Sequence, residues 1–191
     1  MADKIIEAIW DSTAAELESL LVEKGNPDAS EAGSSALLWA CTINDPEKVK
    51  LLLRYGADVN LADEDGETPL MRAASTGDVE SVAALLKMNA NPNAVNDIGQ
   101  TALMLASKEG KLEIVKLYVE YNVDVLAVDD LGRTALNWAL TDSDHAEVVS
   151  YLVTMGLDPF QKNKNGMTPL DYADQLNREE CLKIMKDGNN G

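Results

Sequence analysis

Apolar residues recur along most of the chain with the spacing of short amphipathic helices. The segments DVESVAALLKM (78–88) and KLEIVKLYVEY (111–121) are two clear cases. A shorter apolar segment precedes each of them, TPLMRAAS at 68–75 and TALMLASK at 101–108. Polar turns lie between these segments. The pattern therefore predicts pairs of helices, a short one followed by a longer one.

The helix pairs recur at a fixed spacing. Each pair follows a polar turn that ends in glycine, namely DEDG, NDIG, DDLG and NKNG. Gly33, Gly66, Gly99 and Gly132 are 33 residues apart, and Gly166 follows after 34. A period of this length is typical of stacked supersecondary units. One helix pair cannot bury its apolar face alone, whereas stacked copies can.

The residues at the predicted helix starts fit this arrangement. Proline is tolerated in the first turn of a helix, where Pro69 and Pro169 stand. Asp45 can cap a longer helix that begins at Pro46, and TAAE at 13–16 matches a capping box. The longer fifth step places an extra residue within TDSDH at 141–145. Threonines that can cap the short helices stand at Thr68, Thr101, Thr134 and Thr168.

These motifs resemble the ankyrin repeat family. The segments EDGETPLMRAASTGDVESVAALL (64–86) and YGADVNLAD (55–63) follow the family's repeat closely. The resemblance implies an all-α solenoid of about six helix–turn–helix units, with β-turn finger loops along one edge. We expect a single domain over 1–191, whose first and last units act as caps with polar outer faces. The units are 1–29, 30–62, 63–95, 96–128, 129–162 and 163–187.

The chain departs from the family at one repeated position. Where the family has the histidine of its T-P-L-H motif, this chain has Leu38, Met71, Met104, Asn137 and Asp171. The resemblance implies that this histidine bonds to the backbone of a neighbouring loop. Asn137 and Asp171 could replace it, while the leucine and the methionines could not.

The composition narrows the choice of partners. The 191 residues are 46% hydrophobic, with 16 Lys and Arg against 33 Asp and Glu, which gives a net charge of −17. This charge repels nucleic acid and anionic membranes and suits a protein partner with a basic patch. No apolar run approaches the ~20 residues of a membrane helix. We expect a cytoplasmic protein that is a monomer when free; an export signal removed before residue 1 would leave no trace.

Catalytic chemistry is poorly represented. Cys41 and Cys181 lie in apolar helical patterns, as small core residues do. The single histidine, His145, is expected to stabilise a turn; its neighbours Asp142 and Asp144 could join it in a small metal cluster, but no second ligand group exists. No nucleotide-binding or nucleophile motif occurs. We therefore expect no enzyme activity, no cofactor and no metal site.

Repetition places the same position of every unit in one column. By the resemblance, three columns line a concave groove where family members bind proteins. A column inside the short helices holds Trp, Arg and Tyr, the residues most enriched in binding hot spots; packing between neighbouring helices is the alternative. Apolar residues at the finger tips suggest a contact surface. Acidic residues on the fingers either steer a basic partner toward the protein or only keep this edge of the protein solvated. The candidate partner-binding residues are Trp39, Asp65, Glu67, Arg72, Asp97, Ile98, Leu105, Asp130, Leu131, Trp138 and Tyr172.

The leading hypothesis is a non-enzymatic protein–protein interaction module that binds through the groove and the finger loops. The alternative is an inhibitor or immunity-type protein that blocks the active site of a partner enzyme. A small chain favours this alternative slightly, because scaffold proteins usually carry further domains.

Overall fold

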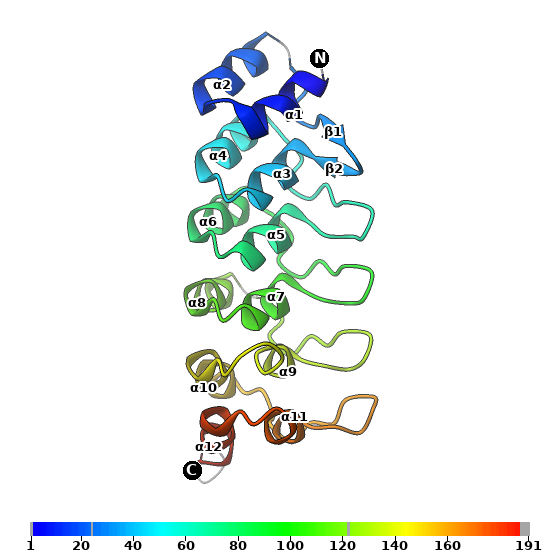
Figure 1. The fold of residues 1–191 in the computed structure, drawn as a ribbon, viewed down its shortest axis with the longest axis vertical. Helices are drawn as coiled ribbons and strands as arrows, with labels where there is room; N and C mark the ends of the chain where they lie inside the picture. Colours follow the sequence, from blue (N-terminus) through cyan, green and yellow to red (C-terminus); the bar gives the residue numbers. More distant parts are fainter. Residues whose placement is uncertain (1, 24, 122, 188–191) are drawn as a thin grey trace. The chain divides into compact units, whose positions relative to one another are not determined.

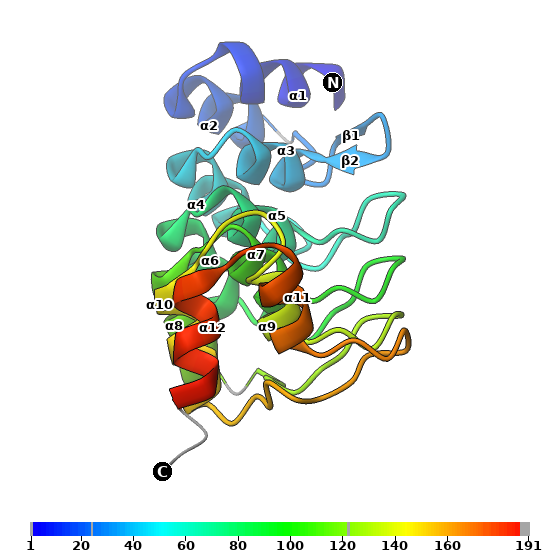
Figure 2. The same cartoon turned by 60° about the horizontal axis from the view of Figure 1, so that its bottom comes forward.

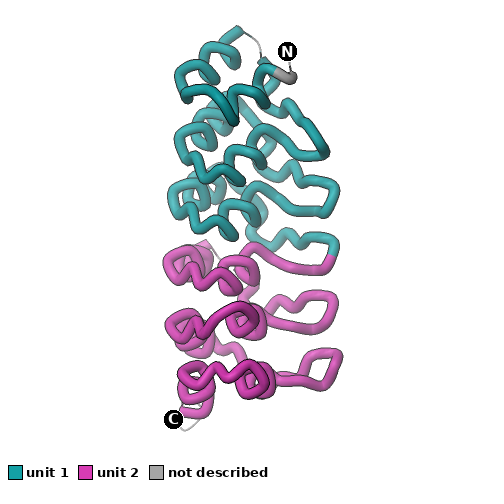
Figure 3. Tube along the Cα trace, viewed as in Figure 1, with its two compact units in different colours: residues 1–97 teal, residues 98–191 magenta. Residues whose placement is uncertain are grey.

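The computed structural model describes residues 2–23, 25–121 and 123–187. The described residues form paired helices and one short hairpin, and a loop projects beside the first helix of each pair after the first one (Figure 1). The chain divides into two compact units, residues 1–97 and residues 98–191 (Figure 3). We call them unit 1 and unit 2, and each has its own buried core.

Unit 1 contains three helix pairs. Lys48 is buried in α4 and donates from Nζ to the carbonyl oxygen of Ile9 at 2.7 Å, which ties α4 to the end of α1. The core of the first pair, α1 and α2, includes Ile5, Ile9 and Leu17, all buried as their apolar spacing requires. The elements of unit 1 are α1 (Ala2–Asp11), α2 (Ala14–Val22), β1 (Ser30–Glu31), β2 (Ser34–Ser35), α3 (Ala36–Thr42), α4 (Pro46–Arg54), α5 (Pro69–Thr76) and α6 (Val79–Lys87).

Unit 2 contains three further pairs, whose first helices carry the loops seen on one side in Figure 2. Its core includes Leu103, Val115, Tyr118 and Leu136, which are almost fully buried. Its elements are α7 (Ala102–Lys108), α8 (Leu112–Glu120), α9 (Ala135–Trp138), α10 (Ala146–Thr154), α11 (Pro169–Gln175) and α12 (Glu179–Asp187).

The expected helix caps are present, with one exception. The side chains of Thr68, Thr101 and Thr168 accept from the third backbone N–H of their helices, and Asp45 does the same for α4. Thr13 and Glu16 form the predicted capping box. Thr134 differs: its N–H and its hydroxyl both donate to the side-chain oxygen of Asn137, at 3.0 and 3.2 Å.

The polar residues at the histidine position of the repeat bond within their own helix start. Asn137 Oδ1 accepts from Thr134, and Asp171 Oδ2 accepts from the N–H and hydroxyl of Thr168, each at 2.8 Å. The expectation that Asn137 or Asp171 bonds to a neighbouring loop backbone is therefore wrong: within the described residues, both bond to the threonine at the start of their own helix. A side chain shorter than histidine reaches its own cap first.

The extra residue of the fifth repeat shortens the helix before it. Helix α9 ends at Trp138, and the next repeat closes the longer loop. Arg178 donates to the carbonyl oxygens of Leu140 and Thr141 at 3.1 and 3.0 Å. In return, Asp144 accepts from the N–H groups of Glu180 and Cys181, each at 3.2 Å. The insertion therefore has partners in the last helix pair.

Backbone hydrogen bonds join consecutive finger loops within each unit. In unit 1, the Asp97 N–H donates to the Asp65 carbonyl at 3.0 Å. In unit 2, the Asp130 N–H donates to the Ile98 carbonyl at 3.2 Å, and Lys164 donates to Leu131 at 2.9 Å. Consecutive finger tips are therefore held next to one another.

This close approach requires glycine at the tip. Gly99 has a φ of +77°, a left-handed conformation that side chains disfavour. A Cβ there would also lie 2.8 Å from the backbone nitrogen of Asp130 on the next finger. The glycine period in the sequence thus marks where one finger passes the next.

Candidate functional site

One polar side chain closes the base of three of the fingers. Asp63 Oδ1 accepts from the N–H groups of Asp65 and Glu67 at 3.1 and 2.9 Å. Asp129 does the same for Leu131 and Arg133, and Asn163 for Asn165 and Met167. Asp and Asn favour turns because their side chains can bond the backbone two residues on. We call Asp63, Asp129 and Asn163 the finger-base residues.

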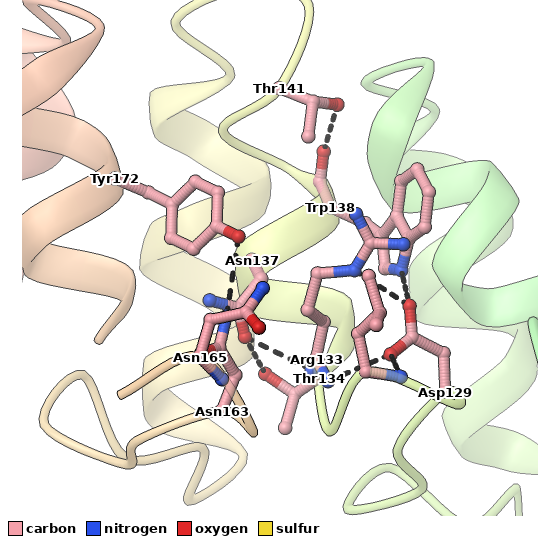
Figure 4. A network of polar contacts seen from close by, with 10 residues as sticks. Asp129, Arg133, Thr134, Asn137, Trp138, Thr141, Asn163, Asn165 and Tyr172 are labelled. Atoms are coloured by element: carbon pink, nitrogen blue, oxygen red, sulfur yellow. Dashed lines mark hydrogen bonds and ion pairs between the residues drawn. The ribbon is translucent and has the colours of Figure 1, made fainter. Parts of the chain in front are cut away.

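The helix column of Trp, Arg and Tyr contacts these same finger-base residues. Trp138 donates from Nε1 to Asp129 Oδ2 at 3.1 Å (Figure 4). Asn163 donates from Nδ2 to the Tyr172 hydroxyl at 3.2 Å. Arg72 lies 3.5 Å from Asp63 Oδ2. Each pair is nine residues apart, so the column braces the finger of its own repeat.

Trp138 belongs to a closed cluster. Only 9% of Trp138 is exposed, and the Asp129 side chain is fully buried. Arg133 covers the indole ring, with its guanidinium carbon 4.0 Å from the ring centre, and donates from Nε to Asp129 Oδ2 at 2.7 Å. The carboxylate thus has a charged partner and an indole donor. In this structure Trp138 has a packing role, which the sequence had left open.

Leu105 is also buried, with 8% exposed. It occupies the same column as Trp138 in the repeat before. Neither residue offers a partner much surface, and Trp138 braces its finger base through Asp129. Their part in partner binding stays a prediction.

Arg72 remains partly accessible but is already paired. Its guanidinium lies 2.7 Å from Glu67 and 3.5 Å from Asp63, and a third of its side chain is exposed. Two carboxylates around one guanidinium leave this finger with a net negative charge. Arg72 and Glu67 neutralise each other, and the acidic surface of this finger comes from the exposed Glu64 and Asp65.

Trp39 and Tyr172 are half-buried. The Trp39 ring lies 5.3 Å from the ring of Trp10, centre to centre, and tilted against it. Unlike Trp138, the buried Nε1 of Trp39 has no hydrogen-bond partner among residues 2–23, 25–121 and 123–187. The same column position thus serves different local contacts.

The finger tips are open. Ile98 is 51% exposed and Leu131 is 42% exposed, and they lie on consecutive fingers of unit 2 that the Asp130–Ile98 hydrogen bond joins. Asp130 beside Leu131 is exposed too. In unit 1, Asp65 and Asp97 are exposed on fingers joined in the same way. Asp97 and Ile98 stand next to each other on one tip, as Asp130 and Leu131 do on the next, so each of these two tips carries an acidic and an apolar side chain.

Sequence reasoning missed part of the exposed apolar surface of unit 2. Leu126, Val128 and Phe160 lie on the segments that lead into its fingers, and all three are exposed. The first two stand in VDVLAVDD (123–130), a run that reads like ordinary core sequence. Side chains of an extended segment point alternately to opposite faces. Because Asp129 is buried, its neighbours Val128 and Asp130 are exposed, and this alternation is the one signal that Val128 is not a core residue.

The reactive side chains are buried or structural. Cys41 and Cys181 are free and buried, and burial raises the pKa of each thiol. The His145 ring packs against Gly110, so close that a Cβ on that glycine would overlap it. In the part of the chain that the structure describes, no three His, Cys, Asp or Glu side chains are grouped as metal ligands. None of the described helices is long and apolar enough to cross a membrane.

Comparison with protein families matches most of the chain. A model described as ankyrin repeats (3 copies) matches residues 6–96 and 103–190, and one described as ankyrin repeats (many copies) matches residues 76–117. A search of curated proteins finds no match. The all-α repeat fold expected from the sequence is confirmed by these matches and by the helix pairs of both units. The chain belongs to the ankyrin repeat family.

Proposed function

We propose that this protein is a non-enzymatic module that binds a folded protein partner through its finger loops and the exposed faces of its short helices. The observation that carries the proposal is the pair Ile98 and Leu131. Large apolar side chains are half-exposed on two consecutive tips whose backbones are fixed by hydrogen bonds. A rigid apolar contact loses little conformational entropy on binding.

The candidate residues divide into two groups. Leu105 and Trp138 are buried, and Trp138 supports the finger base at Asp129. The accessible group forms the proposed contact face and comprises Trp39, Asp65, Glu67, Arg72, Asp97, Ile98, Asp130, Leu131 and Tyr172.

Site-specific photo-crosslinking tests the proposal. A photoreactive amino acid replaces Asp65 or Leu131 on the fingers, and matched proteins carry it at Glu47 or Glu147 on α4 and α10. All four positions are exposed, and Leu131 is the one apolar residue among them. We expect the finger positions to capture one protein and the helix positions to capture none. Capture at Glu47 and Glu147 alone would overturn the proposal.

The identity of the captured protein separates scaffold from inhibitor. If the module is an inhibitor, the crosslinked peptide of the partner borders its active site and the complex is inactive. Crosslinks remote from any active site would exclude the inhibitor alternative and would be consistent with a protein–protein interaction module. The proposal itself requires only that the finger positions capture a protein, whether or not that protein is inhibited.

A further inference from the structure

Exposed acidic side chains lie on the finger tips, and exposed apolar side chains lie on the tips and on the segments beside them. In unit 1 the tips carry the exposed acids Glu31, Glu64, Asp65 and Asp97, while Leu61 and Val95 are exposed on the segments that lead to its fingers. In unit 2 five large apolar side chains are exposed on and beside the fingers, and we call them the apolar finger row: Ile98, Leu126, Val128, Leu131 and Phe160. Exposed apolar side chains are common singly, but here Ile98 and Leu131 recur on consecutive tips joined by a hydrogen bond, and Leu126 and Phe160 recur at one position of consecutive repeats, as a contact surface would require.

Hydrogen bonds fix the backbone at residues of the apolar finger row. The Asp124 side chain accepts from the Leu126 N–H at 3.1 Å, and the Asp158 side chain accepts from the Phe160 N–H at 2.8 Å. The tip residues are held by the bonds from Asp130 to Ile98 and from Lys164 to Leu131. Four of the five row residues therefore stand on turns fixed by hydrogen bonds.

Carboxylates accompany the row. Asp124, Asp130 and Asp158 are exposed within two residues of Leu126, Leu131 and Phe160. Two lysines, Lys162 and Lys164, stand beside Phe160 on the last finger, so the acidic border belongs mainly to segment 124–131. Unit 2 has 9 Lys and Arg against 15 Asp and Glu, a net charge of 9 − 15 = −6. Unit 1 has 7 against 18, a net charge of 7 − 18 = −11.

We infer that the apolar finger row docks a protein surface on which aliphatic or aromatic side chains are bordered by lysine or arginine. This rests on the proposed function and names the partner's chemistry. A second copy of this chain is a poor occupant, because each copy carries −17 and the like charges repel. Apolar burial at the row supplies affinity, while the acidic border selects partners by charge.

A panel of peptides of equal length tests the inference on the full chain. The four peptides are built from leucine and lysine, serine and lysine, leucine and glutamate, and leucine and serine. Binding is measured by fluorescence anisotropy at physiological salt. We expect the leucine–lysine peptide to bind most tightly. If the serine–lysine peptide binds equally well, charge alone explains binding and apolar contact at the row is excluded. If the leucine–serine peptide binds equally well, the partner needs no lysine or arginine around its apolar side chains.

A matched pair of variants locates the binding. Ile98→Ser with Leu131→Ser should weaken the leucine–lysine peptide at least ~10-fold, the equivalent of about 1.4 kcal/mol. Leu176→Ser is the control, because Leu176 is 40% exposed in the same unit and stands at the end of α11, away from the row. It should leave binding unchanged. Equal loss in both proteins, or loss in neither, would overturn the inference.

Vesicles provide the last arm. Phosphatidylcholine vesicles carry no net charge and offer an apolar interior, so they would bind the row if its occupant were a membrane. We expect no co-sedimentation; binding that Leu131→Ser abolishes would assign the row to lipid instead. If the finger crosslinks to a native partner appear but the peptides do not discriminate, the inference fails and the proposed function stands. If the crosslinks themselves are absent, the proposed function fails.

Discussion

Trp138 donates its indole N–H to the Oδ2 of Asp129, nine residues before it, at 3.1 Å. This bond joins a short helix to the base of its own finger. Asp129 in turn holds the N–H groups of Leu131 and Arg133, so the helix, the turn and the exposed tip form one bonded group. A change in the helix should therefore reach the finger tip.

Removing the indole donor tests this brace. Trp138→Phe keeps an aromatic ring but loses the bond to a buried carboxylate, so we expect a loss of about 1–2 kcal/mol in the free energy of unfolding beyond that of its control. The control is Trp39→Phe, the same change at the same repeat position, where the buried Nε1 has no partner among the described residues. Urea unfolding measures both. Equal losses would mean that the Trp138–Asp129 bond does not stabilise the fold.

The glycine tips allow a second matched comparison. Gly99 and Gly166 share a φ of +77°, but only Gly99 faces the next finger at short range. Gly166→Ala should cost about 1–2 kcal/mol of unfolding free energy, from the left-handed backbone alone. Gly99→Ala should cost more, because its Cβ would meet the Asp130 nitrogen at 2.8 Å. Thermal or urea unfolding gives the difference, and the same loss for both would remove close packing as the reason for the period.

Burial in the repeat core predicts both size and place of an effect. Leu85→Ala in α6 should lose about 2–5 kcal/mol, because Leu85 is fully buried and the change leaves a cavity. Leu17→Ala removes the same atoms from a fully buried position in the first helix pair, where the repeat has only one neighbour. Hydrogen exchange should then show lost protection in α1 and α2 before α6. A uniform loss along unit 1 would contradict nearest-neighbour stabilisation.

Asp171 gives a prediction for pH. Hydrogen bonds from the backbone and side chain of Thr168 hold its pKa below the ordinary value of 3.8. The folded state therefore favours the carboxylate, and this contribution is present above the unfolded pKa and lost as pH falls through the folded one. The stability difference between the wild-type protein and Asp171→Asn should be present at neutral pH and shrink on acidification below 3.8. A difference that stays constant with pH would show that the cap does not depend on charge.

The exposed acids should act on association and not on the fold. Changing Asp65, Asp97 and Asp130 together to asparagine should slow association with the captured partner at low salt, and added salt should erase the effect. A control that removes the same charge from the longer helices, at Glu47, Glu113 and Glu147, should slow it less. Stopped-flow mixing over a salt series measures both. An unchanged rate for the finger variant would make these acids ordinary solvated residues.

The sequence predicts the repeat well and the site only in part. The spacing of Gly66 and Gly99, the caps at Thr68 and Asp45 and the insertion near Asp144 all depend on local rules, and the structure confirms them. The role of Trp138 depends on which side its ring turns, and a residue type enriched in hot spots is also a good core residue. The pairing of Asp129 with Trp138 could have been suspected, since Asp63 with Arg72 and Asn163 with Tyr172 repeat the same nine-residue spacing. Exposure of Leu126 and Phe160 could not, because it depends on which face of an extended loop its neighbours cover.

Hydrogen exchange of the complex tests the central claim most directly. Exchange is measured for the free chain and for the chain bound to the captured partner, at the same protein concentration. Binding through the fingers predicts slower exchange in segments 30–35, 63–67, 96–100 and 129–133, with α4, α6, α8 and α10 unchanged. Slower exchange confined to α4, α6, α8 and α10, with the finger segments unchanged, would contradict the account.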